Sequence, residues 1–197
     1  MKSVNKKYLD DLPPTTTIEE AYLASRYRQR FLGSLRSTIF MLIVVAASAV
    51  LVAVLFLPIL RIYGQSMSGT LNSGDIVVSV KSVQFETGDV IAFYYNNNIL
   101  VKRVIATSGQ WVDIDKEGNV YVDDTYLKES YLQSKAYGES NIDFPYQVPE
   151  DRVFVMGDNR ELSIDSRNTA VGTVSEEQIV GKLLYRIWPL RDMGGIQ

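Results

Sequence analysis

The sequence of 197 residues is long enough for one domain of moderate size and an anchor. It contains no cysteine and no histidine, which excludes disulfides, thiol nucleophiles, His- or Cys-ligated metal sites and a Ser-His-Asp triad. The net charge of −3 divides into +3 for residues 1–36 and −6 for residues 37–197. An acidic main part argues against nucleic acid as a partner. Since there is also no DxDxDG loop, neither a metal nor a cofactor is expected.

Residues 37–60 form a run of 24 residues without a charged side chain. A helix that rises about 1.5 Å per residue crosses a hydrocarbon core of about 30 Å with such a run. A buried core helix is seldom this long without a polar face. A cleaved signal sequence has a shorter apolar core nearer the chain start. The sequence therefore predicts a single uncleaved transmembrane helix over residues 37–60.

Basic residues flank this run mainly on its N-terminal side. Four arginines precede it and one follows closely: Arg26, Arg28, Arg30 and Arg36, then Arg61. The positive-inside rule then makes residues 1–36 a cytoplasmic tail and residues 61–197 an extracytoplasmic domain. The protein is thus expected in the cell membrane as a single-pass protein. A short amphipathic helix is expected within the tail, near residues 18–32.

Short β-type runs follow from Asp75 onward, separated by clusters of Gly, Asp and Asn. The predicted strands are DIVVSVK, DVIAFYY, ILVKRVIA, QWVDID, NVYV, RVFVMGD and IVGKLLYRIWPL. Without βαβ alternation, this order predicts an all-β or mainly β domain, antiparallel and folded into a partly closed, barrel-like sheet. Residues 124–150 are predicted to be an irregular excursion from the sheet. A helical turn is expected at Ser175–Gln178.

Ser66, the first of two serines in RIYGQSMSGTL, lies just after the apolar run. A serine hydroxyl is a weak nucleophile that needs a base. Without histidine, a lysine can serve if burial keeps it neutral. Lys102 is placed for this because it lies inside the apolar strand run ILVKRVIATSG. The same pattern also fits an edge charge that blocks aggregation, so the residues alone leave both interpretations open.

The run MGDNRELSIDSR, Met156–Arg167, is a polar segment directly after an apolar strand. One interpretation is a charged surface loop. The other is a loop braced by its own ion pairs and hydrogen bonds, which holds a hydroxyl against a neutral lysine.

Three segments, GQSMSGTL, LVKRVIATSG and GDNRELSIDSR, resemble the characteristic boxes of type I signal peptidases in their short Gram-positive bacterial form. Their order, their spacing and the preceding apolar run all match. The tail VGTVSEEQIVGKLLYRIWPL resembles the closing strand of the family. The resemblance covers the chain from about residue 30 to its end and implies a mainly antiparallel β catalytic domain on a membrane anchor.

The resemblance also implies roles for single residues. Ser66 matches the nucleophile, Lys102 the general base, and Ser163 the serine that orients the lysine. The acids and bases that brace the site in the family match Asp158, Arg160, Asp165 and Arg167. The residues that line its substrate pockets match Met67, Ile62, Leu71 and Val101. The N–H of Ser66 is expected to be one oxyanion donor. Gly64 stands where some members carry a second donor hydroxyl.

The implied activity is that of a membrane-anchored serine endopeptidase. It cleaves signal peptides from exported pre-proteins after small residues of the Ala-x-Ala type, through a Ser-Lys dyad and an acyl-enzyme. The expected partners are these signal peptides, membrane lipid and a nearby secretion translocon. The alternative is a peptidase or signal-peptidase-like factor dedicated to pilus or other surface-structure assembly. A self-cleaving repressor with a Ser-Lys dyad is disfavoured by the apolar run and by the absence of a basic DNA-binding module.

Two positions depart from the pattern of the family. Gly69 replaces the proline of Ser-Met-x-Pro-Thr-Leu, and Gln110 replaces the aspartate that usually follows the KRVIA box. Glycine is expected to loosen the loop that presents Ser66, because proline fixes φ. On this view, the substitution Gly69→Pro preserves or raises cleavage.

Overall fold

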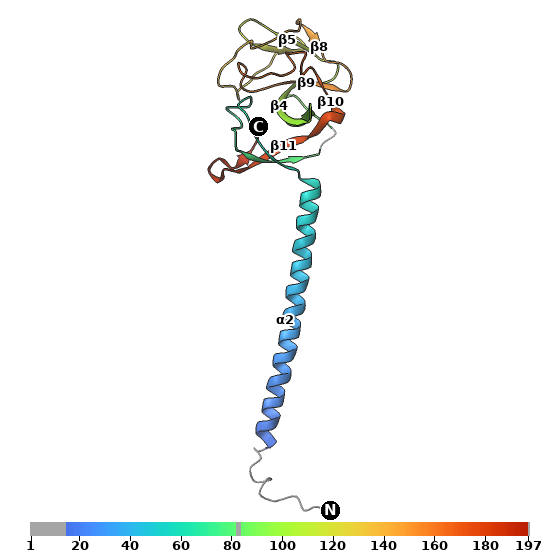
Figure 1. Cartoon of the computed structure of the whole chain (residues 1–197), viewed down its shortest axis with the longest axis vertical. Helices are drawn as coiled ribbons and strands as arrows, with labels where there is room; N and C mark the ends of the chain where they lie inside the picture. Colours follow the sequence, from blue (N-terminus) through green and yellow to red (C-terminus); the bar gives the residue numbers. More distant parts are fainter. Residues whose placement is uncertain (1–14, 82–83, 197) are drawn as a thin grey trace, which may run out of the picture. The chain divides into compact units, whose positions relative to one another are not determined.

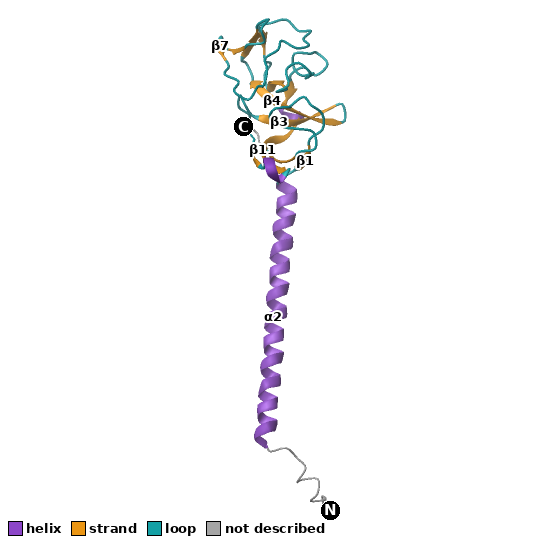
Figure 2. Cartoon of the chain, turned by 90° about the vertical axis from the view of Figure 1, so that its left-hand side faces the viewer, coloured by secondary structure: helices purple, strands orange, loops and turns teal. Residues whose placement is uncertain are grey.

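The computed structural model describes residues 15–81 and 84–196 of the chain. The chain divides into two compact units, residues 1–52 and 53–197. The helix α2 (Thr15–Phe56) is one uninterrupted helix (Figure 2), where the sequence predicts a short helix near residues 18–32 and a separate span. Its segment Ser25–Val52, with a mean hydropathy of 2.2, is long and apolar enough to cross a membrane. The first part of the predicted tail, residues 1–14, lies outside the described residues.

The helix α2 ends at Phe56, four residues before the predicted end of the span. The cause is Pro58, which lacks an N–H and disfavours helical backbone in the residue before it. The chain then becomes extended and forms the strand β1 (Ile59–Arg61), which pairs with β2.

Two antiparallel sheets make up the rest of the chain (Figure 1). The larger sheet has the order β1, β2 (Ile76–Val80), β11 (Ile179–Trp188), β3 (Val90–Tyr95), β4 (Asn98–Ala106), β9 (Arg152–Met156) and β10 (Val174–Ser175), with β12 (Gly194–Gly195) beside β11. The smaller sheet has the order β7 (Thr125–Tyr126), β6 (Val120–Val122), β5 (Trp111–Ile114) and β8 (Tyr146–Gln147). The predicted mainly β, antiparallel fold is confirmed. Within the described residues β1 and β10 form the two edges of the larger sheet and do not pair with each other, so the sheet stays open and no barrel closes.

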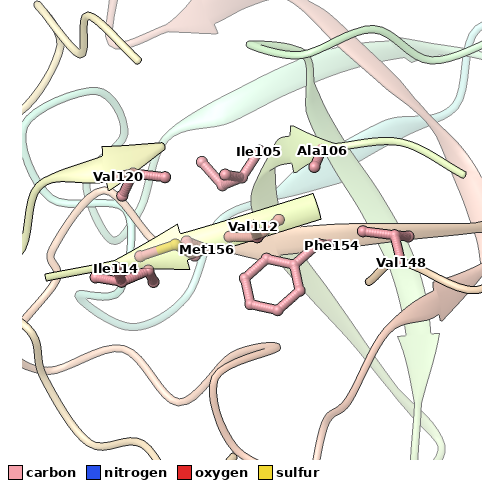
Figure 3. Close-up of a cluster of buried hydrophobic side chains, with 8 residues drawn as sticks. All are labelled: Ile105, Ala106, Val112, Ile114, Val120, Val148, Phe154 and Met156. Carbon is pink, nitrogen blue, oxygen red and sulfur yellow. The ribbon is translucent and has the colours of Figure 1, made fainter. Parts of the chain in front are cut away.

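The two sheets share a core of eight buried apolar residues (Figure 3). Its members come from β4, β9, β5 and β6 and from the segment after β8: Ile105, Ala106, Phe154, Met156, Val112, Ile114, Val120 and Val148. Burying apolar area of this kind gains about 25 cal/mol per Å². The shared core therefore fixes the smaller sheet, and the excursion that leaves it, against β4 and β9.

The excursion is irregular as predicted, apart from the two-residue strands β7 and β8. The predicted helical turn is also present as the 3₁₀-helix η1 (Glu176–Gln178), with Ser175 as its N-cap. A second short 3₁₀-helix, η2 (Leu190–Asp192), follows β11.

Candidate active site

Ser66 lies on the loop of residues 62–75 that connects β1 to β2 and contains a turn at residues 67–71. Ile62 begins the loop with backbone bonds to Asp75 and Gly74, and the Leu71 N–H closes the turn on the carbonyl of Met67 at 2.8 Å. The Ser66 side chain is partly exposed. No residue in the described ranges accepts a hydrogen bond from its N–H. The loop therefore presents a hydroxyl and an unused backbone donor at the same surface.

Lys102 lies in the central strand β4, between β3 and β9, and its relative exposure is 3%. The interpretation as an edge charge is therefore wrong. No described residue forms an ion pair or a hydrogen bond with its ammonium group. Burial lowers the pKa of Lys102 from 10.5 to about 8, against the opposing effect of Asp165. A removable proton near neutral pH is the property a lysine base needs.

Gly157 is the point at which the segments of the site meet. Strand β4 pairs with β9 through Arg103 and Met156, and Lys102 and Gly157 are the next residues of the two segments beyond this last pair. A Cβ placed on Gly157 would overlap the side chain of Ser163 and the carbonyl oxygen of Ser66. The Ser66 carbonyl also accepts a bond of 3.0 Å from the Asn159 N–H. The close packing at Gly157 thus brings together the segments of the predicted nucleophile, base and orienting serine.

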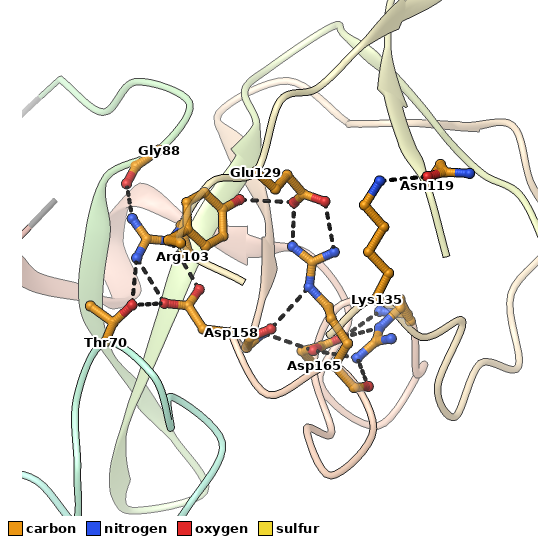
Figure 4. A network of polar contacts seen from close by, with 12 residues as sticks. Thr70, Gly88, Arg103, Asn119, Glu129, Lys135, Asp158 and Asp165 are labelled. Atoms are coloured by element: carbon orange, nitrogen blue, oxygen red, sulfur yellow. Dashed lines mark hydrogen bonds and ion pairs between the residues drawn. The ribbon is translucent and has the colours of Figure 1, made fainter. Parts of the chain in front are cut away.

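Asp158 ties the turn of Ser66 to the strand of Lys102 (Figure 4). Its carboxylate accepts a bond of 2.5 Å from the Thr70 hydroxyl. It also accepts two bonds, of 2.9 and 2.7 Å, from the guanidinium of Arg103. Thr70 lies four residues after the serine, and Arg103 follows the lysine directly. A buried bidentate pair of this kind is geometrically specific, so one carboxylate sets the position of both segments.

Arg160 is held from outside its own loop, by Glu129 of the excursion. Both guanidinium nitrogens of the fork contact the Glu129 carboxylate, and both side chains are buried. Glu129 also accepts a bond of 2.8 Å from the Tyr131 hydroxyl. The Tyr131 ring in turn lies 3.8 Å from the guanidinium carbon of Arg103. The predicted self-bracing loop is therefore braced in part by residues 129–131.

Asp165 and Arg167 form the pair that lies within the loop itself, as the interpretation of a braced loop expects. Their side chains are fully buried and meet at 2.8 Å. Asp165 also accepts a bond of 2.9 Å from the Gly157 N–H. Arg167 donates to the carbonyls of Arg160 and Ser163, at 2.9 and 3.3 Å. This pair fixes both ends of the loop that carries Ser163.

The Ser163 hydroxyl is the exception in this hydrogen-bonded region. Among residues 15–81 and 84–196, its oxygen is the one buried side-chain nitrogen or oxygen atom without a hydrogen-bond partner. An unpaired buried hydroxyl costs free energy, so such a group calls for an explanation. A hydroxyl that changes its hydrogen-bond partner during a reaction provides such an explanation.

A small cavity of about 50 Å³ opens beside Ser66. Three of the predicted pocket residues, Ile62, Met67 and Val101, line it together with Gly64. The fourth, Leu71, is fully buried in the adjoining core and does not line the cavity. One water needs about 10–15 Å³ on this measure, so the cavity accepts a group of only a few atoms.

Gln110 has a structural role away from Ser66. Its side-chain oxygen accepts bonds from the backbone N–H and hydroxyl of Thr107, which closes the turn after β4. Its amide nitrogen donates to Asp123 at 3.0 Å. The replacement of aspartate at this position thus affects a turn.

Comparison with known proteins now decides the family. Residues 34–188 match the family model described as signal peptidase, peptidase S26. The chain belongs to the signal peptidase family. It is 35% identical to signal peptidase IB of Staphylococcus aureus over 156 residues, which cover 66% of this chain and 78% of the relative.

A plant relative is matched over a smaller part of its length. The chain is 33% identical over 165 residues to thylakoidal processing peptidase 1, chloroplastic, of Arabidopsis thaliana, and the match covers 73% of this chain. The chain spans about half, 47%, of that relative. The crystal structure of a signal peptidase I from Enterococcus faecalis shares 28% identity and aligns with a TM-score of 0.44, over 51% of this chain and 97% of the other.

Sequence patterns missed several residues that hold the site of this signal peptidase family member together. They are Thr70, Arg103, Glu129 and Tyr131. Thr70 and Arg103 lie inside the quoted boxes, so their position was the available signal. Glu129 and Tyr131 lie in a polar excursion whose composition resembles that of any solvated loop, so no pattern indicated that Glu129 is buried.

Gly69 contradicts the expectation that proline is tolerated at this position in this family member. Its φ is +109°, a conformation that glycine adopts easily and that other residues adopt rarely. Proline is held near −65°, so it cannot occupy this backbone. Side-chain space is not the obstacle, because an added Cβ would lie 3.4 Å from the Gln133 side chain.

We therefore expect Gly69→Pro to lower kcat/KM for a pre-protein by about 10- to 100-fold, because the turn that carries Ser66 must change its backbone. Gly69→Ala, which adds only the cost of a positive φ, serves as the matched comparison and should lose less. The measurement is processing of a fluorescent pre-protein by purified enzyme. Full activity of Gly69→Pro would show that the turn relaxes freely.

Proposed function

We propose that this protein is an endopeptidase that removes signal peptides from exported pre-proteins, with Ser66 as nucleophile and Lys102 as general base. The observation that carries the proposal is a buried lysine next to the Arg103–Met156 pair, without an ion pair to any described residue, whose pKa is lowered to about 8. At Gly157 the backbone of Ser66 and the side chain of Ser163 are in contact range. Membership in the signal peptidase family supports the same chemistry.

In the proposed reaction, neutral Lys102 Nζ takes the proton from Ser66 Oγ as Oγ bonds to the scissile carbonyl carbon. The carbonyl oxygen becomes an oxyanion, and the unused N–H of Ser66 donates to it. When the C–N bond breaks, Lys102 gives the proton that it took from Ser66 to the leaving amine. This leaves an acyl-enzyme on Ser66.

Water then completes the cycle. Lys102 takes a proton from the water as it attacks the acyl carbon, and returns that proton to Ser66 Oγ as the acid product leaves. The unpaired hydroxyl of Ser163 supports a role in this exchange. It can accept a hydrogen bond from the lysine in one step and donate one in the next.

The cavity beside Ser66 supports a preference for small residues before the cut. With a volume of about 50 Å³ and apolar walls at Ile62, Met67 and Val101, it suits an alanine side chain. Larger side chains would need the buried Ile62 and Met67 to move. An Ala-x-Ala substrate places such a residue directly before the scissile bond.

We also propose that α2 anchors the catalytic domain in the membrane, with residues 1–36 in the cytoplasm and residues 61–197 outside. The helix supports this by length, since its 42 residues at about 1.5 Å each extend well beyond the ~30 Å of a hydrocarbon core. Exposed apolar residues at the end of the domain also support lipid contact: Trp188, Leu190 and Met193.

The test of the dyad is the processing of a fluorescent pre-protein with an Ala-x-Ala site by the purified full chain. Ser66→Ala should be inactive, while a serine-directed acylating agent should form a covalent acyl adduct on Ser66 of the unchanged chain. A variant Ser66→Ala that retained full activity would remove Ser66 from the mechanism. Exposed Ser73→Ala, on the loop before β2, is the matched control.

The pH profile of the same reaction gives a further prediction. Since only the neutral amine accepts a proton, kcat/KM should rise about tenfold per pH unit and level off above the Lys102 pKa of about 8. The measurement is the initial rate at low substrate concentration from pH 6 to about 10. A flat profile across that range would rule out a titrating lysine base.

A further inference from the structure

A separate cavity of about 350 Å³ is lined by residues that neighbour Ser66 in the chain or bond to its backbone. It is lined by Ser68, Gln133, Asn159, Glu161 and Leu162, among others, and we call it the polar cavity. Ser68 lies two residues after Ser66, and the Asn159 N–H binds the Ser66 carbonyl at 3.0 Å. The polar cavity is therefore next to the proposed nucleophile.

The two cavities differ in size and chemistry. The small cavity is walled by apolar residues that include Ile62 before Ser66 and Val101 of β4. The polar cavity is walled by residues after Ser66, by the loop after β9 and by Gln133 of the excursion. An extended peptide advances about 3.3 Å per residue, so a chain lying across Ser66 has residues on both sides of the cut within reach of these walls.

We infer that the polar cavity binds the first residues of the mature chain, directly after the scissile bond, and selects against acidic side chains there. This inference rests on the proposed function. The small cavity accepts the residue before the cut, so the chain on the leaving side is directed to the polar cavity. Its hydroxyl and amide walls suit the polar start of a mature protein.

The charge of the cavity sets the preference. It contains two carboxylates, Asp158 and Glu161, and no basic residue among those that line it. Asp158 is neutralised by its bidentate bond to Arg103. Glu161 is exposed and has no ion pair within the described ranges. The net negative charge at the leaving side thus comes from Glu161, and it repels an acidic residue and attracts a basic one.

Gly69 contributes to the shape of this cavity. The Gln133 side chain lies 3.4 Å from the point where a Cβ on Gly69 would stand. With proline, the residue that the family pattern has here, the turn and the adjoining wall would differ. The departure at Gly69 therefore affects the side of the site that faces the mature chain.

The test uses three pre-proteins that share one Ala-x-Ala signal peptide and differ only in the second residue after the cut: Gln, Lys or Glu. For the unchanged enzyme we expect kcat/KM to be about two- to fivefold higher for Lys than for Glu, as for an exposed charge pair. The preference should shrink as salt rises from about 0.05 to 0.5 M. In Glu161→Lys the order should reverse.

The ratio is taken within each variant, so a change in overall activity does not affect it. Gln133→Lys, from a different segment of the wall, should shift the ratio in the same direction as Glu161→Lys. Glu150→Lys, at an exposed site outside the cavity, is the control and should leave the ratio unchanged. Failure to cleave even the Gln substrate would contradict the proposed function. The inference would be overturned if the Lys-to-Glu ratio of Glu161→Lys equalled that of the unchanged enzyme. It would also be overturned if Glu150→Lys shifted this ratio as much as Glu161→Lys does.

Discussion

Lys102→Met is expected to abolish processing and, at the same time, to stabilise the folded chain at pH 7. Loss of a general base lowers rates by about 10²–10⁴-fold. Methionine keeps the unbranched shape of the side chain but removes a buried charge. Burial lowers the pKa of Lys102 from 10.5 to about 8. At 1.36 kcal/mol per pKa unit, the ammonium then costs the folded chain about 3 kcal/mol at pH 7.

The pH dependence of this gain has a definite sign. The folded-state pKa of Lys102 lies below the unfolded value, so between about 8 and 10.5 the unfolded chain binds more protons. The stability of the unchanged protein therefore rises with pH across that window. The advantage of Lys102→Met should be complete below pH 8 and should disappear toward pH 10.5.

Urea unfolding of both proteins in detergent, at pH 7 and at pH 10, measures the difference. The control is Lys128→Met, because Lys128 is exposed and has no ion pair among the residues described. It should change neither activity nor the pH dependence of stability. A variant Lys102→Met that is less stable than the unchanged protein at pH 7 would mean that the ammonium is stabilised where it lies, and the proposed base would lose its support.

Gly157→Ala is the second change with a large expected effect. The added methyl group would overlap the Ser163 side chain and the Ser66 carbonyl. Neither can move freely, because Asn159 bonds to both: its N–H to Ser66 and its carbonyl to the Ser163 N–H, each at 3.0 Å. We expect kcat/KM to fall by about 100-fold and the free energy of unfolding to fall by about 1–3 kcal/mol.

Processing rates and thermal unfolding of Gly157→Ala check both values. Gly194→Ala is the matched control, because nothing lies within 4 Å of the added Cβ there. If Gly157→Ala kept full activity, contact of the three segments at this glycine would not matter for the reaction. If activity fell by more than the lower fraction of folded protein can explain, the result would support a role of Gly157 in aligning the three segments.

The strands of the β domain were predictable because each one is indicated by its own run of β-branched and aromatic residues. All seven predicted strand runs from Asp75 onward contain strands, and the capped turn at Ser175 is present. The sequence did not reveal β1, because Ile59 and Leu60 continue an apolar run and only Pro58 marks the change. It also did not reveal the two-residue strands β7, β8, β10 and β12, whose pairing depends on tertiary contacts.

The candidate site was predictable to the extent that chemistry restricts it. Without histidine, the possible bases for a serine are Lys, Asp, Glu or Tyr, and the apolar run around Lys102 favoured a lysine. Lys102 is indeed buried. The pairing of the charges was not predictable in the same way. Arg160 pairs with Glu129, 31 residues away in an excursion without periodicity, and not with an acid of its own loop. Backbone conformation was also hidden, since a glycine letter does not reveal that φ at Gly69 is positive.

The carboxylate of Asp158 has a consequence for biosynthesis. It joins Thr70 and Arg103, which precede it by 88 and 55 residues. A chain made from its N-terminus exposes the Ser66 turn and the strand of Lys102 well before Asp158 and β9 follow. Until that residue docks, the serine and the lysine lack the bond that aligns their segments. The proposed site of a nascent chain is therefore incomplete until Asp158 has been synthesised and has docked against Thr70 and Arg103.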